Sequence, residues 1–149
     1  MVPRNIGKIQ KLLTVYHKKY RNPGLRPLRM SGLYALFPKQ SKSAAIKLAG
    51  SWPALWPDVD SAGVYLLFDT NFNLLYVGKT SLRQTFGSRF YDWFRRDKHT
   101  GGCRVIGEWS RKTPAYVATI AVQLPFEAPS LEEYLIHELR PSDNSVGAR

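Results

Sequence analysis

The sequence predicts an α+β fold, in which a small, mainly antiparallel β-sheet is flanked by helices and preceded by a basic helical extension. Three observations predict it: a hairpin pattern over residues 64–79, two later β-prone segments, and helical patterns near both ends of the chain. With 149 residues, 44% of them hydrophobic, the chain has room for one compact domain, or a small domain with an extension. We expect a basic extension and connector over residues 1–60 and the compact domain over residues 61–149.

Residues 1–60 begin with the pattern of an amphipathic helix that ends before Asn22-Pro23-Gly24. Its apolar positions are Ile6, Ile9, Leu12, Leu13, Tyr16 and Tyr20. A short strand is expected over residues 32–37 and a second short helix over residues 43–48. The segment holds eleven basic and two acidic residues, a net charge of +9, whereas the remainder of the chain carries +2. Most of the charge that would bind a polyanion therefore lies in the extension.

The predicted hairpin of residues 64–79 consists of two β-prone runs joined by a turn over residues 70–73. With the turn centred in the middle of that segment, Tyr65 pairs with Gly78, and Tyr76 lies diagonally beside Tyr65 on the same face. The other face is apolar throughout and is expected to pack on the core. Two phenol side chains are thereby expected to be exposed beside a glycine that leaves room for a ligand.

A helix is predicted directly after the hairpin, because Ser81 and Gln84 fit a capping box. Apolar side chains recur along it at helical spacing, and Arg89 stands at the edge of that stripe. The stripe consists of Leu82, Phe86, Phe90 and Trp93. Strands are then expected over residues 104–109 and 116–124.

The last predicted helix begins near Pro129. Ser130 and Glu133 fit a second capping box. That motif gives Glu133 a structural explanation and leaves the adjacent carboxylate of Glu132 without one. Glu132 is therefore a candidate functional residue.

Gly63-Val64-Tyr65, followed after ten residues by Tyr76-Val77-Gly78, resembles the signature pair of the GIY-YIG nuclease superfamily. That family includes homing endonucleases, some restriction enzymes and the incision domain of the bacterial nucleotide-excision-repair nuclease. The resemblance extends from residue 62 to about residue 147. It implies a metal-dependent endonuclease that hydrolyses DNA phosphodiester bonds.

The resemblance also implies which residues act in catalysis. They are Tyr65, Tyr76, Arg89, Glu132 and Asn144. The family places an arginine on the helix after the hairpin to hold the scissile phosphate. Arg89 is our candidate, and Arg83 is a second one because Arg89 lies later along the chain than the family's arginine. Glu132 is expected to hold a divalent metal, Mg²⁺ in the first place with Mn²⁺ possible, and Asn144 to support the site or simply to turn the chain.

The sequence leaves the catalytic roles of Tyr65 and Tyr76 undecided. A free tyrosine has a pKa near 10, so a tyrosine general base needs a lowered pKa, or else the residue only orients the attacking water. Lys79, Arg89 and the metal could each lower that pKa. The sequence does not decide which tyrosine, if either, removes a proton.

Further contacts with the substrate are expected around the hairpin and at the end of the helix that follows it. The candidates are Gly78, Lys79, Arg83, Arg95, Arg96, Lys98 and His99. The last four would contact flanking phosphates. Their alternative interpretation is a helix C-terminus, where cations interact favourably with the helix dipole.

The expected partner is DNA, with RNA less favoured, because the net charge is +11 and the pI is about 10.0. No apolar run approaches the length of a membrane span, and no interface of a homodimer can be read from the sequence. The single cysteine, Cys103, excludes an internal disulfide framework and a cysteine-based zinc site. An intracellular, cytoplasmic protein is expected.

Two other functions compete with the nuclease. One is a nucleic-acid-binding module that has the same fold and does not cleave. The other is a basic structural or RNA-associated protein in which the signature is accidental. The sequence contains no phosphate-binding loop, no His-Glu-x-x-His and no Gly-x-Ser-x-Gly that would indicate a different chemistry.

Overall fold

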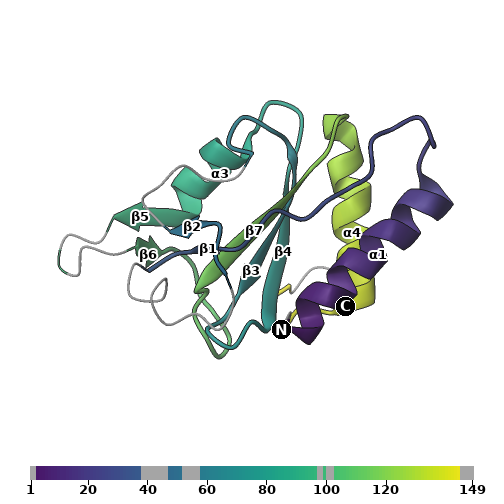
Figure 1. Cartoon of the computed structure of the whole chain (residues 1–149). Coiled ribbons are helices and arrows are strands. Elements are labelled where there is room, and N and C mark those ends of the chain that lie inside the picture. The colour runs from purple at the N-terminus through teal and green to yellow at the C-terminus, as the bar shows by residue number, and fades with distance from the viewer. Residues whose placement is uncertain (1–2, 38–46, 52–57, 97–98, 100–102, 145–149) are drawn as a thin grey trace.

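The computed structural model describes residues 3–37, 47–51, 58–96, 99 and 103–144 (Figure 1). Its helices are α1 (Arg4–Tyr20), α3 (Phe86–Trp93) and α4 (Ala128–Leu139), and a short 3-10 turn, η1 (Pro125–Glu127), precedes α4. Its strands are β1 (Tyr34–Ala35), β2 (Gly50–Ser51), β3 (Gly63–Phe68), β4 (Leu74–Thr80), β5 (Phe94–Arg96), β6 (Cys103–Val105) and β7 (Tyr116–Ala121). No helix in these ranges combines the length and the apolar character that crossing a membrane requires.

Five strands form the main sheet in the order β2-β1-β7-β3-β4. Every neighbouring pair in it is antiparallel except β1 with β2, while β5 and β6 form a separate antiparallel pair. The predicted class, α+β with a mainly antiparallel sheet, is confirmed. The predicted hairpin register is confirmed too, since Tyr65 lies opposite Gly78 and Leu67 lies opposite Tyr76.

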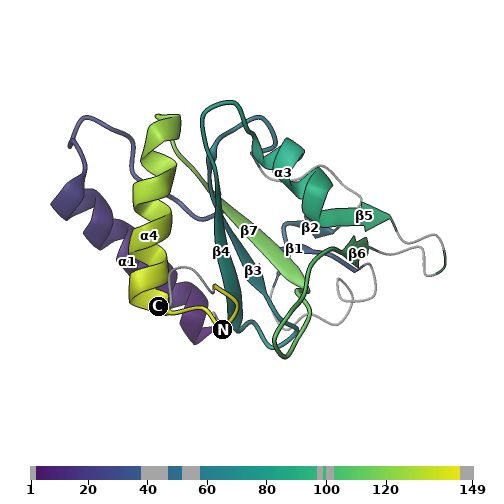
Figure 2. The same ribbon diagram turned by 180° about the vertical axis from the view of Figure 1, so that it is seen from behind.

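Both faces of the sheet are covered. Helices α1 and α4 lie on one side, and α3 with β5 and β6 lies on the other, as the two opposite views show (Figures 1 and 2). All six residues of β3 are buried, because β3 lies between β7 and β4 and beneath a layer on each side. The expectation that Tyr65 is exposed is therefore wrong: its side chain has 0% exposure.

The apolar stripe of α1 packs as predicted, with Ile9 and Leu13 almost completely buried. The hydroxyl groups of Tyr16 and Ser130 lie 2.9 Å apart, which links α1 to α4. Tyr20, predicted to lie in the same stripe, is 65% exposed at the last turn of the helix. The described part of residues 1–60 thus belongs to the same hydrophobic core as β3, β7 and α4.

An ion pair fixes the chain where it leaves α1. At its end, Arg21 Nε lies 2.7 Å from the carboxylate of Glu127, and Arg21 Nη2 donates to the same carboxylate at 3.0 Å. This bidentate pair is buried on the arginine side, so it fixes the direction in which the following segment runs. The predicted second short helix, residues 43–48, lies mostly outside the described residues.

Both predicted capping boxes are wrong. Helix α3 begins at Phe86, where Thr85 and Ser88 form a capping box, and Leu82 stands in an exposed turn at φ 57°. Helix α4 begins at Ala128, before Ser130, without a side-chain cap. The predicted motifs depend only on neighbouring residues, whereas tertiary contacts favour other starting residues for both helices. At the start of α3, Phe86 N donates to Ser61 O. In the first turn of α4, Ser130 contacts α1.

Candidate active site at the hairpin

The hydroxyl of Tyr65 is the centre of a buried polar cluster between β3 and α3. It accepts a hydrogen bond from Trp93 Nε1 at 2.9 Å and another from Arg89 Nε at 3.3 Å. Arg89 and Trp93 lie one helical turn apart on α3, so both face the same strand. With both lone pairs of its oxygen engaged, Tyr65 keeps its O–H to donate toward Tyr76.

The two glycines of the signature are required by packing. A Cβ at Gly78 would lie 2.2 Å from Cζ of Tyr65, so the tyrosine ring occupies the space that the glycine leaves. The sequence suggested that this space was for a ligand; it holds the Tyr65 ring instead. At Gly63, φ is 154° and a Cβ would lie 2.1 Å from the carbonyl oxygen of Ile120, so β3 and β7 approach too closely for a side chain there.

Tyr76 stands at the border between this cluster and the surface. Its ring centroid lies 6.1 Å from that of Tyr65, 5.5 Å from that of Trp93 and 6.1 Å from that of Trp109. The residue is half-buried, whereas Tyr65 is fully enclosed. Of the two phenols, Tyr76 is therefore the one that solvent or a substrate reaches.

The pKa values of both phenols are raised. Burial is the largest cause for Tyr65, whose pKa lies well above its ordinary value although Arg89 and Trp93 donate to its oxygen. Burial also raises the pKa of Tyr76, and the charge of Glu132 adds to that effect, while Arg89 and hydrogen bonding to Tyr65 oppose it. Both residues are neutral near pH 7 in this state, and neither is a ready general base.

Glu132 reaches the same area from α4. Its carboxylate is half-buried, and burial raises its pKa, while the positive charges of Lys79 and Arg89 act in the opposite direction. The pKa of Tyr76 responds to the charge of Glu132, so the two groups lie within electrostatic reach of each other. The hairpin and the helix α3 that follows it, together with the distant α4, thus contribute groups that influence one another electrostatically.

The geometry distinguishes the two candidate arginines. Arg89 is half-buried and donates to Tyr65 through Nε, which leaves its terminal N–H groups for another ligand. Arg83 is exposed in the turn between β4 and α3. Only Arg89 joins the cluster.

Of the predicted basic contacts after α3, the structure describes the side chains of Arg95 and His99. Arg95 is exposed, and its guanidinium group lies 5.2 Å from the ring centroid of Tyr91. Arg96 is the last residue of β5, and His99 lies in an exposed turn. The side chain of Arg96 and the whole of Lys98 lie outside the described residues.

Asn144 is buried and has a clear structural function. Its side-chain amide donates to Val77 O and accepts from Val77 N, both at 2.8 Å, and Asp143 N donates to Leu75 O. Since β4 is an edge strand, these bonds satisfy backbone groups that face away from β3. The structure brings Asn144 to the edge of β4 and shows no hydrogen bond from it to Tyr76 or Glu132 among the described residues.

Two tryptophans belong to the site. Trp93 was placed in the core stripe by its spacing, and nothing in the sequence indicated its bond to Tyr65. Trp109 packs on both Trp93 and Tyr76, and its indole N–H is buried with no hydrogen-bond partner in the described part of the chain. The contact of Trp109 with Tyr76 could not be predicted from sequence periodicity, because Trp109 lies in a segment without regular structure.

The donor set around Glu132 suits a hard cation that keeps most of its water. Among the described residues no three His, Cys, Asp or Glu side chains gather at one point. Mg²⁺ is commonly bound through one or two carboxylates, waters and the substrate's phosphate oxygens, so a single carboxylate beside an arginine that can bind phosphate fits this ion.

Comparisons with protein-family models, with curated proteins and with solved structures found no match to this chain.

Proposed function

We propose that this protein is a metal-dependent endonuclease that hydrolyses phosphodiester bonds in DNA with a site of the GIY-YIG type. The observation that carries the proposal is the shared cluster of Tyr65, Tyr76, Arg89 and Glu132. These residues come from the hairpin, α3 and α4, and their charges and hydrogen bonds influence one another. The spacing of the two signature motifs supports the same function.

Each side chain has a distinct task in this proposal. Arg89 binds the non-bridging oxygens of the scissile phosphate through its terminal N–H groups, because its Nε is engaged by Tyr65. Tyr65 is a positioning residue, since it is enclosed and holds both Arg89 and Trp93 in place. Tyr76 faces the solvent side of the cluster and orients the attacking water by hydrogen bonding, because its raised pKa disfavours the phenolate.

Glu132 would hold the divalent cation. When bound, Mg²⁺ neutralises charge on the phosphate and on the leaving oxygen. A raised pKa leaves Glu132 easier to protonate than an exposed glutamate, and the adjacent Lys79 counteracts this and favours the carboxylate. With one such site on one chain, each encounter would cut a single strand.

The test is plasmid nicking by the purified full chain with Mg²⁺ or Mn²⁺, and with EDTA instead. We expect conversion of supercoiled to nicked plasmid only with metal. Glu132→Gln should lower the rate by about 100-fold or more, with DNA affinity retained. Glu133→Gln is the matched control, because Glu133 is the exposed neighbour on the same helix, and it should cleave nearly as the wild type does.

Two results would overturn the proposal. Cleavage that persists in Glu132→Gln would show that the site lies elsewhere. No cleavage of plasmid, flapped or branched DNA by a wild-type protein that binds all three would favour a non-cleaving nucleic-acid-binding module.

A further inference from the structure

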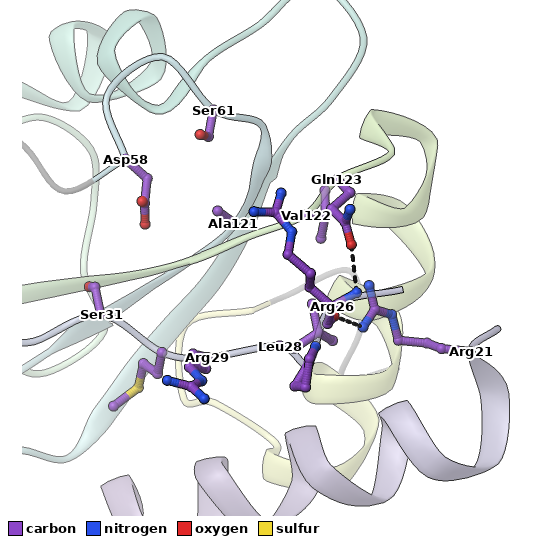
Figure 3. Close-up of a pocket in the computed structure, with 12 residues that line it drawn as sticks. Arg21, Arg26, Leu28, Arg29, Ser31, Asp58, Ser61, Ala121, Val122 and Gln123 are labelled. Atoms are coloured by element: carbon purple, nitrogen blue, oxygen red, sulfur yellow. Dashed lines mark hydrogen bonds between the residues drawn. The ribbon is translucent and has the colours of Figure 1, made fainter. Parts of the chain in front are cut away.

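A basic groove lies on the molecule apart from the tyrosine cluster. A groove of about 730 Å³ opens between the segment that follows α1, the loop before β3 and the end of β7 (Figure 3). Three arginines line it, Arg21, Arg26 and Arg29, and the one acidic side chain among its lining residues is Asp58. None of the catalytic candidates described above lines this groove.

The wall that carries the arginines is held in place by its backbone. Arg26 N donates to Gln123 Oε1 at 2.7 Å, and Arg26 O accepts from Arg21 Nη1 at 2.7 Å (Figure 3). Farther along, Ser31 N donates to Thr119 O, and Thr119 N donates to Ser31 Oγ. The segment is thereby fixed to β7 at Thr119 and to the chain just after β7 at Gln123, so the groove is a built feature of the fold.

The arginines differ in their partners. Arg21 is buried and neutralised by Glu127, and its role is to hold the wall. Arg26 and Arg29 are exposed, and no hydrogen bond or ion pair within the described ranges engages their guanidinium groups. Two guanidinium groups, each with several N–H donors, are thus available to an anion.

The opposite wall has a different polarity. Asp58 accepts a hydrogen bond from Thr119 Oγ1 at 2.9 Å and lies with Ser61 across the groove from Arg26 (Figure 3). The carboxylate of Asp58 repels phosphate groups from that wall, and it can accept hydrogen bonds from the hydroxyl groups of a sugar or the amino groups of a base. A groove with cations on one side and such acceptors on the other suits a nucleotide unit better than a bare phosphate ion.

The groove lies at the end of the sheet where β3 begins and β4 ends. Ala121, which lines the groove, pairs with Gly63, and Gly63 pairs with Thr80, the neighbour of Lys79. Two strand spacings amount to roughly 10 Å, so one stretch of a nucleic-acid strand spans from the groove to β4. At one phosphate per about 3.4 Å along a strand, that distance corresponds to about three nucleotides.

We propose that this groove binds the phosphodiester backbone of a nucleic-acid strand through Arg26 and Arg29, a few nucleotides from the bond that is cut. The position relative to the cut rests on the proposed function, whereas the binding itself does not. The occupant is a polymer because the groove is open and large, and because its arginines belong to the segment of residues 1–60, which carries a net charge of +9.

The test measures binding of a fluorescent single-stranded oligonucleotide by the full chain in EDTA, so that cleavage plays no part. Arg26→Gln with Arg29→Gln should weaken binding about tenfold at 0.15 M salt and lower the slope of log affinity against log salt by about 1.4. Lys8→Gln with Lys11→Gln removes the same charge from the exposed face of α1 and should have a clearly smaller effect. Asp58→Asn removes the negative charge and keeps an oxygen that accepts hydrogen bonds, so it should strengthen binding of the phosphate backbone. Asparagine also tolerates the φ of 53° at this position.

Competition separates the polymer from smaller anions. An unlabelled oligonucleotide should displace the labelled one at a far lower phosphate concentration than inorganic phosphate or a mononucleotide does. Equal loss of affinity in the arginine and lysine double variants, at unchanged thermal stability, would overturn the groove as a binding site. Equal competition by inorganic phosphate would make it a small-anion site and overturn the polymer proposal. Absence of plasmid nicking would reject the proposed function and leave these binding results intact.

Discussion

The two faces of the sheet differ in chemistry although both are buried. The face under α1 and α4 is largely aliphatic, with Leu13, Leu131 and Leu135 in its core. The face under α3 is smaller and largely aromatic, and the hydroxyl of Tyr65 accepts hydrogen bonds there from Arg89 and Trp93. The two layers thus differ: α1 and α4 supply most of the aliphatic burial, and α3 holds the hydroxyl of Tyr65 in a polar cluster that Glu132 reaches from α4.

Truncating a core side chain on each face should have the largest effect and should separate the two roles. Leu135→Ala and Phe90→Ala each remove a fully buried side chain, so we expect a loss of about 2–5 kcal/mol in the free energy of unfolding for both. Urea denaturation measures this loss. Phe90 also packs edge-on against Tyr65, with ring centroids 5.3 Å apart, so its variant should lower the cleavage rate at saturating DNA more than Leu135→Ala does.

Equal cleavage rates of the folded fractions of these two variants would contradict the division between the faces. Measuring the rates under conditions where both variants are folded, as judged by circular dichroism, keeps stability and activity apart.

Tyr65→Phe should have a smaller effect on stability and a specific one on activity. The change leaves the N–H donors of Arg89 and Trp93 without their acceptor, which costs about 1–3 kcal/mol in unfolding free energy. DNA affinity should change little, while the cleavage rate falls because Arg89 loses its fixed orientation. Tyr16→Phe is the matched control on the other face, since it removes one hydroxyl that contacts the exposed Ser130.

Chemical denaturation and single-turnover cleavage check this pair of variants. A Tyr65→Phe protein that cleaves at the wild-type rate would remove Tyr65 from the positioning role.

The smallest expected effect concerns the pH dependence of stability at Glu132. Burial raises the pKa of this carboxyl in the folded state, so the folded protein binds its proton more readily than the unfolded chain does. The contribution of Glu132 to the free energy of unfolding therefore falls as the pH rises from below its pKa in the unfolded chain to above its pKa in the folded protein. Glu132→Gln should unfold at a slightly higher temperature than the wild type near pH 7, and the difference should vanish near pH 4.

Thermal melts across that pH range in EDTA test the sign. A difference that is constant with pH, or a Glu132→Gln protein that is less stable at pH 7, would contradict the electrostatic origin. The exposed Glu138→Gln, on the same helix, controls for the loss of one charge.

Local sequence determined a large part of the fold. The apolar spacing of α1, the hairpin register that places Tyr65 opposite Gly78, and the strand within residues 116–124 all follow from short-range patterns. Each depends on neighbouring residues whose geometry is set by helix or strand periodicity. Both helix starts differ from the prediction: α3 begins at another capping box, and α4 begins without a side-chain cap, so a local capping motif alone does not decide where a helix starts.

Tertiary structure alone decided the burial of Tyr65 and the convergence of the site. A strand with apolar residues on both faces does not indicate which face is covered, and β3 is covered on both. The bonds from Arg89 and Trp93 to Tyr65, the electrostatic influence of Glu132 on Tyr76, and the pairing of Asn144 with Val77 all join residues that are far apart along the chain. The groove lined by Arg21, Arg26 and Arg29 arises in the same way, since its walls come from the segment after α1, the loop before β3 and the end of β7. Periodicity carries no information about such distant contacts, because they are fixed by how the layers pack on one another.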